Sequence, residues 1–297
     1  MSIQFTKAKR SAVKARIALC GPSGSGKTYT ALGLACALSD KVAVIDTERG
    51  SASMYVGLNS WEFDTLNPQS FSPASLIEAL GVAAGAGYGC VVVDSLSHYW
   101  MGVDGMLEQV DQRTEKNNSF GTGWKAMRPV ERRMIDALVS YPGHVVVTLR
   151  TKTEYVIEKD DRGKAKPVKI GLKPEQRDGL EYEFSVVGDM DHTNTLTVSK
   201  TRLPMLTGAM ISKPGAELAA TIKDWLADGE DTPGPLIYRA DALDPDATYQ
   251  VMLDLHARVS AAGLLNAPVT DGEDKPTVLG ALIVARGSAL KPQQAAS

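Results

Sequence analysis

The stretch Gly21-Pro22-Ser23-Gly24-Ser25-Gly26-Lys27-Thr28 follows an apolar segment, 15–20, and opens an Ala- and Leu-rich segment, 27–38. The first segment is typical of a buried strand and the second of a helix. Glycine lets successive backbone N–H groups turn toward one anion, next to the positive end of the helix dipole. The order of strand, glycine-rich loop and helix therefore predicts a phosphate-binding loop, which we extend to Tyr29.

The last two residues of the pattern are those that a nucleoside triphosphate requires. Lys27 is expected to neutralise the β- and γ-phosphates of ATP, and the Thr28 hydroxyl to ligate Mg²⁺. A second magnesium ligand is predicted at Asp94, because 91–93 is a Val-Val-Val run that places this carboxylate at the end of a buried strand. The alternative is an aspartate that only caps the turn before Ser95.

Hydrolysis of ATP also needs a group that orients or deprotonates water. Segment 41–46 predicts a further buried strand, and the acidic Asp46-Thr47-Glu48 forms its carboxyl end. Parallel strands bring their carboxyl ends to one edge of a sheet, so we assign Glu48 as the catalytic carboxylate. A surface salt bridge, with Arg49 next in the chain, is the alternative interpretation.

The core is predicted to be α/β and doubly wound, with a mostly parallel twisted sheet. Short β-branched runs without polar alternation are typical of strands covered on both faces, and helices are expected between them. The expected strands are 41–46, 90–94 and 145–149, the expected helices are 75–84 and 125–140, and a long loop is expected over 102–124. The aromatic residues of that loop, Phe120 and Trp124, either stack on bases or belong to the core.

Beyond residue 153 the pattern changes to alternation. It predicts a β-hairpin over 154–170, strands over 183–190 and 194–200, and a closing helix over 216–226. Composition then divides the chain into a core, 1–228, a linker, 229–240, and a small helical C-terminal region, 241–297. Helices are expected in that last region at 247–262 and 277–290.

The bulk composition fits an ordinary globular protein, with 43% hydrophobic and 23% charged residues among 297. No apolar run approaches the roughly 20 residues that span a bilayer, so we expect no membrane partner and a cytoplasmic location. The cysteines, Cys20, Cys36 and Cys90, lack the paired spacing of a zinc site and are expected to be buried and reduced. A net charge of -3 does not indicate a nucleic-acid-binding protein, so any polyanion site is expected to be local.

Segments 42–48 and 91–96 resemble the RecA-type recombinase core, in which a strand-end glutamate is catalytic and a Val-Asp-Ser acid holds magnesium. More narrowly, 17–34, 45–50, 95–100 and 148–155 are similar to phage-encoded RecA-core ATPases of the Sak type, which act as single-strand annealing or recombination proteins. The resemblance covers residues 15–226. It implies a RecA-like P-loop ATPase that uses ATP and Mg²⁺ and binds single-stranded DNA, with a single-strand binding protein as a possible partner.

The same resemblance implies roles for several basic residues. Arg150 occupies the position where RecA-type proteins have a polar residue, commonly glutamine, that links the γ-phosphate to the DNA-binding loop. Because this chain has arginine there, we expect the coupling between ATP and DNA to differ from that of RecA-type proteins. Lys200 and Arg202 resemble paired cations that reach a neighbour's ATP, which implies a homo-oligomer with ATP at the protomer interface. A DNA-binding loop would follow the sensor strand, where five cations occur without an acidic residue: Arg162, Lys164, Lys166, Lys169 and Lys173.

Other functions remain open at this stage. The basic tract has a solvated hairpin face as its alternative interpretation. The core itself also fits a P-loop motor, such as a helicase or a packaging ATPase, or a nucleotide-switched assembly protein without DNA contact. A GTPase is disfavoured because the chain contains no Asn-Lys-x-Asp guanine motif.

Overall fold

The computed structural model describes residues 13–117, 121–159, 165–229 and 232–291, and for 117, 153–159 and 165–173 it describes the backbone alone. Within these residues one nine-stranded sheet has the order β3-β2-β4-β5-β1-β7-β8-β9, with β6 paired to β5. From β3 to β7 in this order the neighbours are parallel, whereas β8 and β9 are antiparallel. The strands are β1 Arg16–Gly21, β2 Val42–Asp46, β3 Asp64–Leu66, β4 Cys90–Asp94, β5 His144–Lys159, β6 Ala165–Pro174, β7 Val186–Met190, β8 Thr195–Thr201 and β9 Met210–Ser212.

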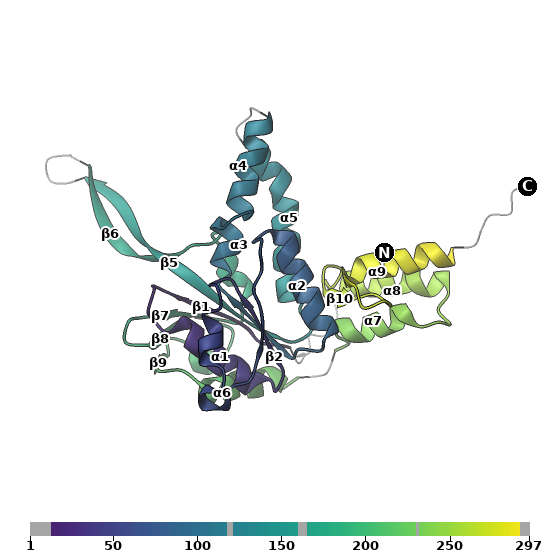
Figure 1. Ribbon diagram of the computed structural model, residues 1–297, viewed down its shortest axis with the longest axis horizontal. Helices are drawn as coiled ribbons and strands as arrows, with labels where there is room; N and C mark the ends of the chain where they lie inside the picture. Colours follow the sequence, from purple (N-terminus) through teal and green to yellow (C-terminus); the bar gives the residue numbers. More distant parts are fainter. Residues whose placement is uncertain (1–12, 118–120, 160–164, 230–231, 292–297) are drawn as a thin grey trace, which may run out of the picture.

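Helices cover both faces of this sheet (Figure 1). Residues of α1 and α6 belong to one buried apolar cluster, and residues of α2 and α5 to another. The α-helices of the core are α1 Lys27–Leu38, α2 Pro73–Gly85, α3 Ser97–Met101, α4 Met106–Asn117, α5 Thr122–Val139 and α6 Ala216–Ala227, with 3-10 turns η1 Ala52–Tyr55, η2 Leu58–Ser60, η3 Leu180–Glu183 and η4 Pro204–Leu206. No helix in the part of the chain that the structure describes is long and apolar enough to cross a membrane.

Strand β1 shows why the sheet is doubly wound. Ala18 and Cys20 belong to the cluster with α2 and α5, while Ile17 and Leu19 belong to the cluster with α1 and α6. Successive side chains of a strand point to opposite faces, so a strand that is apolar at every position must be covered on both. The predicted α/β fold with a mostly parallel sheet is therefore confirmed.

The register brings the polar strand ends together. Gly21 at the end of β1 pairs with Arg150 of β5, and Asp46 at the end of β2 pairs with Asp94 at the end of β4. Since these strands are parallel, the phosphate loop and both aspartates lie on one edge of the sheet.

The prediction of a long loop over 102–124 is wrong. Residues 106–117 form helix α4, which packs against α5, and the pair projects from the sheet (Figure 1). The two helices approach closely at Gly123, where a Cβ atom would meet the carbonyl oxygen of Val110 at 2.2 Å. Only Met106 and Val110 of α4 are buried hydrophobic residues, so the apolar spacing on which the prediction relied is too sparse to reveal this helix.

The predicted hairpin is formed by β5 and β6, and β5 runs without interruption from the central sheet into it. Lys166, Lys169 and Lys173 of the basic tract lie on β6, although their side chains are outside the description. Arg162 and Lys164 lie outside the described residues.

The C-terminal region contains α7 Pro235–Leu243, α8 Tyr249–Ala261, α9 Leu279–Leu290 and a small hairpin of β10 Pro268–Thr270 and β11 Pro276–Val278. Within the linker predicted over 229–240, Pro235 starts α7 at a position where proline is well tolerated in a helix. These elements enclose their own apolar cluster.

The C-terminal region docks on the core through small residues of α2. A Cβ atom at Gly81 would meet Pro276 Cβ at 2.9 Å, and one at Gly85 would meet Thr270 Cγ2 at 2.2 Å. Asn266 Nδ2 also donates to Asp136 Oδ2 of α5 at 3.1 Å. Close approach at glycine therefore sets the position of the C-terminal region.

Gly85→Ala tests this contact. Alanine favours an exposed helix by up to about 1 kcal/mol over glycine, whereas overpacking at a tight contact costs about 1–3 kcal/mol. We expect a lower melting temperature and faster protease cleavage between α6 and α7, and we expect Thr270→Ala, which removes the opposing methyl group, to reverse part of the loss. A more stable Gly85→Ala variant would contradict the docking.

Candidate active site

The phosphate loop is held open by two glycines and one asparagine. Gly24 and Gly26 have φ angles of 78° and 84°, in the left-handed region that favours glycine. A Cβ atom at Gly26 would also meet Asn194 Nδ2 at 2.7 Å, and that same amide donates to the Ser25 carbonyl at 3.1 Å. The turn after β7 thus braces the loop from outside the sequence pattern.

The Lys27 ammonium lies over the loop that carries it. Its Nζ donates to the Pro22 carbonyl at 2.8 Å. Burial lowers the pKa of Lys27, while the carboxylates of Asp94 and Glu48 oppose that effect. A partly desolvated cation beside a glycine-rich loop at the start of a helix is suited to bind a phosphate group.

The Asp94 carboxylate is almost completely buried, with 1% exposure. It accepts hydrogen bonds from Thr28 Oγ1 at 2.6 Å and from Thr148 Oγ1. Burial raises the pKa of Asp94, and the two hydroxyl donors oppose the shift. Thr148, which the sequence did not single out, lies on β5 in the run predicted as a strand.

Hard oxygen donors from Thr28 and Asp94 fit Mg²⁺, which binds one or two protein groups and takes its other ligands from phosphate and water. Within the described residues, no group of three or more His, Cys, Asp and Glu side chains forms a metal site by itself. The donors present therefore fit a magnesium ion that arrives with a phosphate ligand.

The loop after β2 is built on Asp46. Its carboxylate accepts hydrogen bonds from the backbone N–H groups of Glu48 at 2.7 Å and Ala52 at 2.9 Å. Glu48 Oε1 in turn accepts from Arg150 Nε at 3.1 Å and Nη2 at 3.0 Å. Glu48 thus does form a salt bridge, but its partner is Arg150 from β5 rather than the adjacent Arg49.

Helix α3 holds β5 at Arg150, where the strand leaves the central sheet. Ser97 Oγ accepts from the Arg150 backbone N–H at 3.0 Å, and Thr47 Oγ1 lies 2.5 Å from His98 Nδ1. The imidazole of His98 stacks on Phe71 with ring centroids 5.2 Å apart, as expected of a packing residue.

Most of the predicted site residues line one cavity of about 450 Å³ at the carboxyl edge of the sheet. The lining includes the loop residues Gly21, Ser23, Gly24, Gly26, Lys27, Thr28 and Tyr29, and also Glu48, Asp94 and Arg150. Tyr55, Thr151 and Glu175 complete the wall, and none of the three was predicted.

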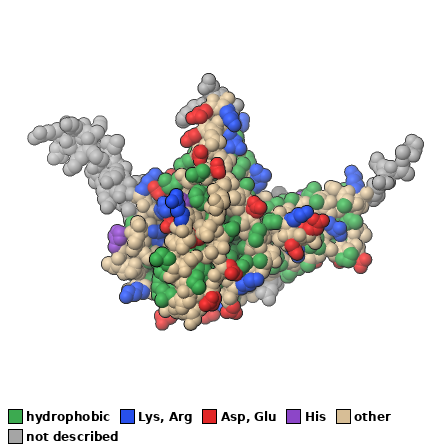
Figure 2. Space-filling model, viewed as in Figure 1, with side chains coloured by type: hydrophobic (Ala, Val, Ile, Leu, Met, Phe, Trp, Pro, Cys, Tyr) green, Lys and Arg blue, Asp and Glu red, His purple; other side chains and the backbone are tan. Residues whose placement is uncertain are grey.

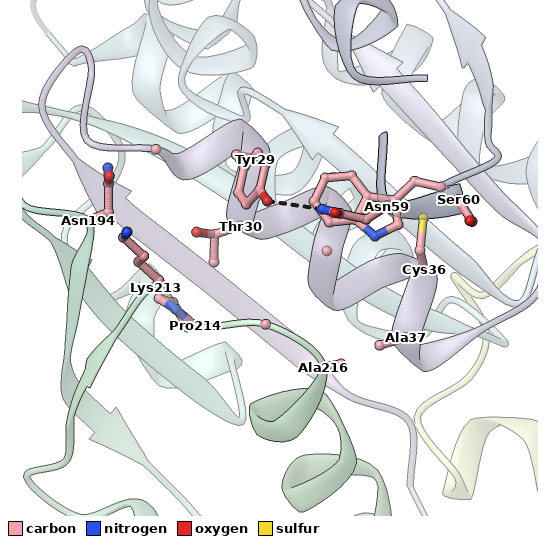
Figure 3. A pocket seen from close by; sticks show the side chains of 14 residues that line it. Tyr29, Thr30, Cys36, Ala37, Asn59, Ser60, Asn194, Lys213, Pro214 and Ala216 are labelled. Carbon is pink, nitrogen blue, oxygen red and sulfur yellow. Dashed lines mark hydrogen bonds between the residues drawn. The ribbon is translucent and has the colours of Figure 1, made fainter. Parts of the chain in front are cut away.

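A second cavity of about 770 Å³ shares Gly26 and Tyr29 with the first (Figure 3). The rings of Tyr29 and Trp61 make an edge-to-face contact with their centroids 4.9 Å apart, and the Tyr29 hydroxyl accepts a hydrogen bond from Asn59 Nδ2 at 3.0 Å. Asn194 and Lys213 lie across the cavity from Asn59 (Figure 3). The pair of cavities matches a charged phosphate site with an adjoining, partly aromatic compartment.

Lys200 and Arg202 are not brought to this site. They lie at the end of β8, beside the amino ends of β1 and β7, on the opposite edge of the sheet. Arg202 Nη2 donates to the Tyr182 carbonyl at 2.9 Å, and Lys200 Nζ donates to the Phe184 carbonyl.

A family model described as an AAA domain matches residues 13–209, more than half of the chain. The matched range contains the phosphate loop, Glu48, Asp94 and Arg150. A comparison with curated proteins finds no match.

Asp94→Asn tests the electrostatics of the site in buffer without nucleotide or divalent metal. Folding raises the pKa of Asp94 above its ordinary value of 3.8, so the folded protein binds a proton at this carboxylate more tightly than the unfolded chain does. The stability of the wild type therefore falls as the pH rises from the unfolded to the folded pKa of Asp94. The neutral, isosteric asparagine should therefore melt at a higher temperature than wild type at neutral pH, and the gap should close as pH falls. Added Mg²⁺ with ADP should raise the melting temperature of the wild type only. If Asp94→Asn melts at a lower temperature than the wild type at neutral pH, burial of the charged Asp94 carboxylate does not destabilise the fold.

Proposed function

This chain belongs to the AAA-domain family of P-loop ATPases, and we propose that it hydrolyses ATP with Mg²⁺, binds single-stranded DNA and promotes annealing or homologous recombination. The observation that carries the ATPase mechanism is the meeting of Lys27, Glu48, Asp94 and Arg150 in one cavity. The DNA-related part and a phage origin rest on the resemblance to Sak-type proteins.

In this proposal the triphosphate lies on the backbone amides of the loop, and the nucleoside occupies the adjoining cavity beside Tyr29. Mg²⁺, held by Thr28 and Asp94, supplies charge neutralisation at the phosphates. Lys27 leaves the Pro22 carbonyl and binds the β- and γ-phosphates.

Glu48 acts as the base in the proposed reaction. Water attacks the γ-phosphorus, the bond to the bridging oxygen breaks, ADP departs, and Glu48 takes the proton of the water. Arg150 holds this carboxylate without nucleotide, but the pair is partly exposed, with side-chain exposures of 43% and 30%. Such an exposed salt bridge stabilises the protein by at most about 1 kcal/mol. A γ-phosphate can therefore replace Glu48 as the partner of Arg150 and leave Glu48 free to act on water.

Lys200 and Arg202 act on a neighbouring protomer in this proposal. Their position at the opposite edge of the sheet excludes contact with the ATP of their own chain without a large rearrangement. An arrangement in which one protomer's β8 faces the next protomer's phosphate loop would form a homo-oligomer with ATP at the interface.

The DNA contact is proposed for the β5–β6 hairpin, whose tract comprises Arg162, Lys164, Lys166, Lys169 and Lys173. On the face shown in Figure 2, basic and acidic side chains are interspersed. A local, extended element suits such a surface better than a broad basic patch, and it gives binding that weakens with salt. A single-strand binding protein is a further proposed partner.

Turnover of ATP by the wild type and three variants tests the mechanism, each with and without single-stranded DNA. Lys27→Ala should lose nucleotide binding, since the cation over the loop is removed. Glu48→Gln should bind ATP normally and stall hydrolysis by about 100-fold or more, since general base catalysis is worth about 10²–10⁴-fold. Lys223→Ala, an exposed change on α6, serves as the control.

Equal turnover in Glu48→Gln and wild type would show that another group is the base. Wild-type turnover that does not rise with DNA would favour a nucleotide-switched assembly protein. Electron microscopy with DNA and ATP distinguishes a filament or annealing ring from a translocating motor.

Arg150→Ala tests the exchange of partners between Glu48 and the γ-phosphate. A group that contacts only the γ-phosphate leaves ADP affinity unchanged, while loss of one transition-state donor lowers kcat by about 10²–10³-fold. Calorimetric titration with ADP and single-turnover hydrolysis measure the two quantities. Equal losses of ADP binding and turnover would assign Arg150 a structural role instead.

A further inference from the structure

A third cavity, of about 610 Å³, lies where the β5–β6 hairpin and the α4–α5 pair leave the core. Its wall includes Trp100 of α3, Trp124, Arg128 and Arg132 of α5, and Lys152 of β5. The two projections diverge above this region (Figure 1). The ATPase mechanism uses none of these five side chains.

The aromatic part of the wall is a tryptophan pair. The ring centroids of Trp100 and Trp124 are 5.8 Å apart, with 39° between the planes. Both side chains are partly buried, and both pack against the apolar cluster under α2 and α5. They are therefore fixed from the core side while they also line the cavity, which is how a rigid stacking platform for a planar ligand is built.

The cationic part of the wall comes from two elements. Arg128 and Arg132 are exposed and four residues apart on α5, so they lie on the same side of that helix. Lys152, also exposed, continues β5 two residues beyond Arg150. The three cations thus line the same cavity as the tryptophans, where they can pair with the backbone phosphates of a bound strand.

Acidic groups line the same cavity and narrow the choice of ligand. Glu131 is buried and lies 3.4 Å from Arg177 Nε, so its charge is balanced within the wall. Glu175 and Asp178 supply further acceptors. A simple phosphate trap would not combine carboxylates with tryptophans, whereas exocyclic amines of bases use such acceptors.

This cavity is connected to the active site. Glu175 lines both cavities, and its backbone N–H donates to the Arg150 carbonyl at 2.7 Å. Helix α3 makes a second link, because it carries both Ser97, which binds the Arg150 backbone, and Trp100. A ligand here would therefore contact the strand and the helix that position Arg150.

We propose that this cavity binds unstacked bases of single-stranded DNA, with Trp100 and Trp124 stacking on bases and Arg128, Arg132 and Lys152 binding the adjoining phosphates. The inference rests on the DNA binding proposed above and assigns it a second site, beside the core rather than on the outer hairpin. Because the site borders Glu175, occupancy by DNA is sensed at Arg150.

Tryptophan fluorescence of the full chain, titrated with dC oligonucleotides, tests the proposal. The protein has four tryptophans, and the other two, Trp61 and Trp225, lie on the opposite face of the sheet. We expect the oligonucleotide to quench the fluorescence, and we expect most of this quenching to disappear when Trp100 or Trp124 is replaced. Trp124→Ala should weaken binding about tenfold or more, and Trp124→Phe, which keeps an aromatic face, should weaken it less.

Arg132 and Arg133 form a matched pair for the phosphate contact, since both are exposed on α5 but only Arg132 lines the cavity. Arg132→Ala should weaken binding and reduce the slope of log K against log salt by about 0.7, and Arg133→Ala should change neither. Thermal unfolding checks that each variant is folded.

Each outcome decides between distinct conclusions. If the wild type binds oligonucleotide but all pocket variants bind equally well, this site is wrong and the hairpin remains the DNA contact. If the wild type hydrolyses ATP but binds no oligonucleotide, the DNA-binding function itself fails. Quenching by an acidic peptide and not by DNA would overturn the inference in favour of a protein ligand.

Discussion

The geometry of the candidate active site depends on one buried carboxylate that accepts hydrogen bonds from two hydroxyl groups. Asp94 on β4 accepts from Thr28 of the phosphate loop and from Thr148 on β5, so a single group joins three elements at the carboxyl edge of the sheet. A carboxylate at this depth is costly unless its hydrogen bonds are satisfied. Both donors must therefore stay close, and that requirement keeps the loop, the metal ligand and the strand of Arg150 in a fixed relation.

Strand β5 extends this relation outward. It carries Thr148 at the buried carboxylate, Arg150 at Glu48 and Lys152 at the tryptophan-lined cavity, and it continues into the hairpin with β6. Alternate residues of a strand share a face, so these three groups follow one another along one face of β5. The weak, partly exposed pair of Arg150 and Glu48 is the point at which a phosphate ligand competes with the protein, and it lies between the two proposed ligand sites.

The sequence revealed the parts whose chemistry is local. The glycine loop, the Lys27 ammonium and the Thr28 hydroxyl are adjacent in the chain, and a loop that binds phosphates needs little else to be recognised. Apolar runs without alternation also indicated a sheet covered on both faces, because strand burial is visible residue by residue. Helix α4 escaped notice since its surface is mostly polar and only two of its hydrophobic residues reach the core.

Partners distant in the chain were decided by tertiary structure alone. Nothing in the sequence indicates that Arg150 rather than Arg49 binds Glu48, that Asn194 braces the phosphate loop, or that Glu175 borders two cavities. Sequence patterns report which side chains are buried and which turns are possible, because those depend on neighbours along the chain. Strand register and crossover connections determine which strand ends meet, and they arise only when the whole sheet is assembled.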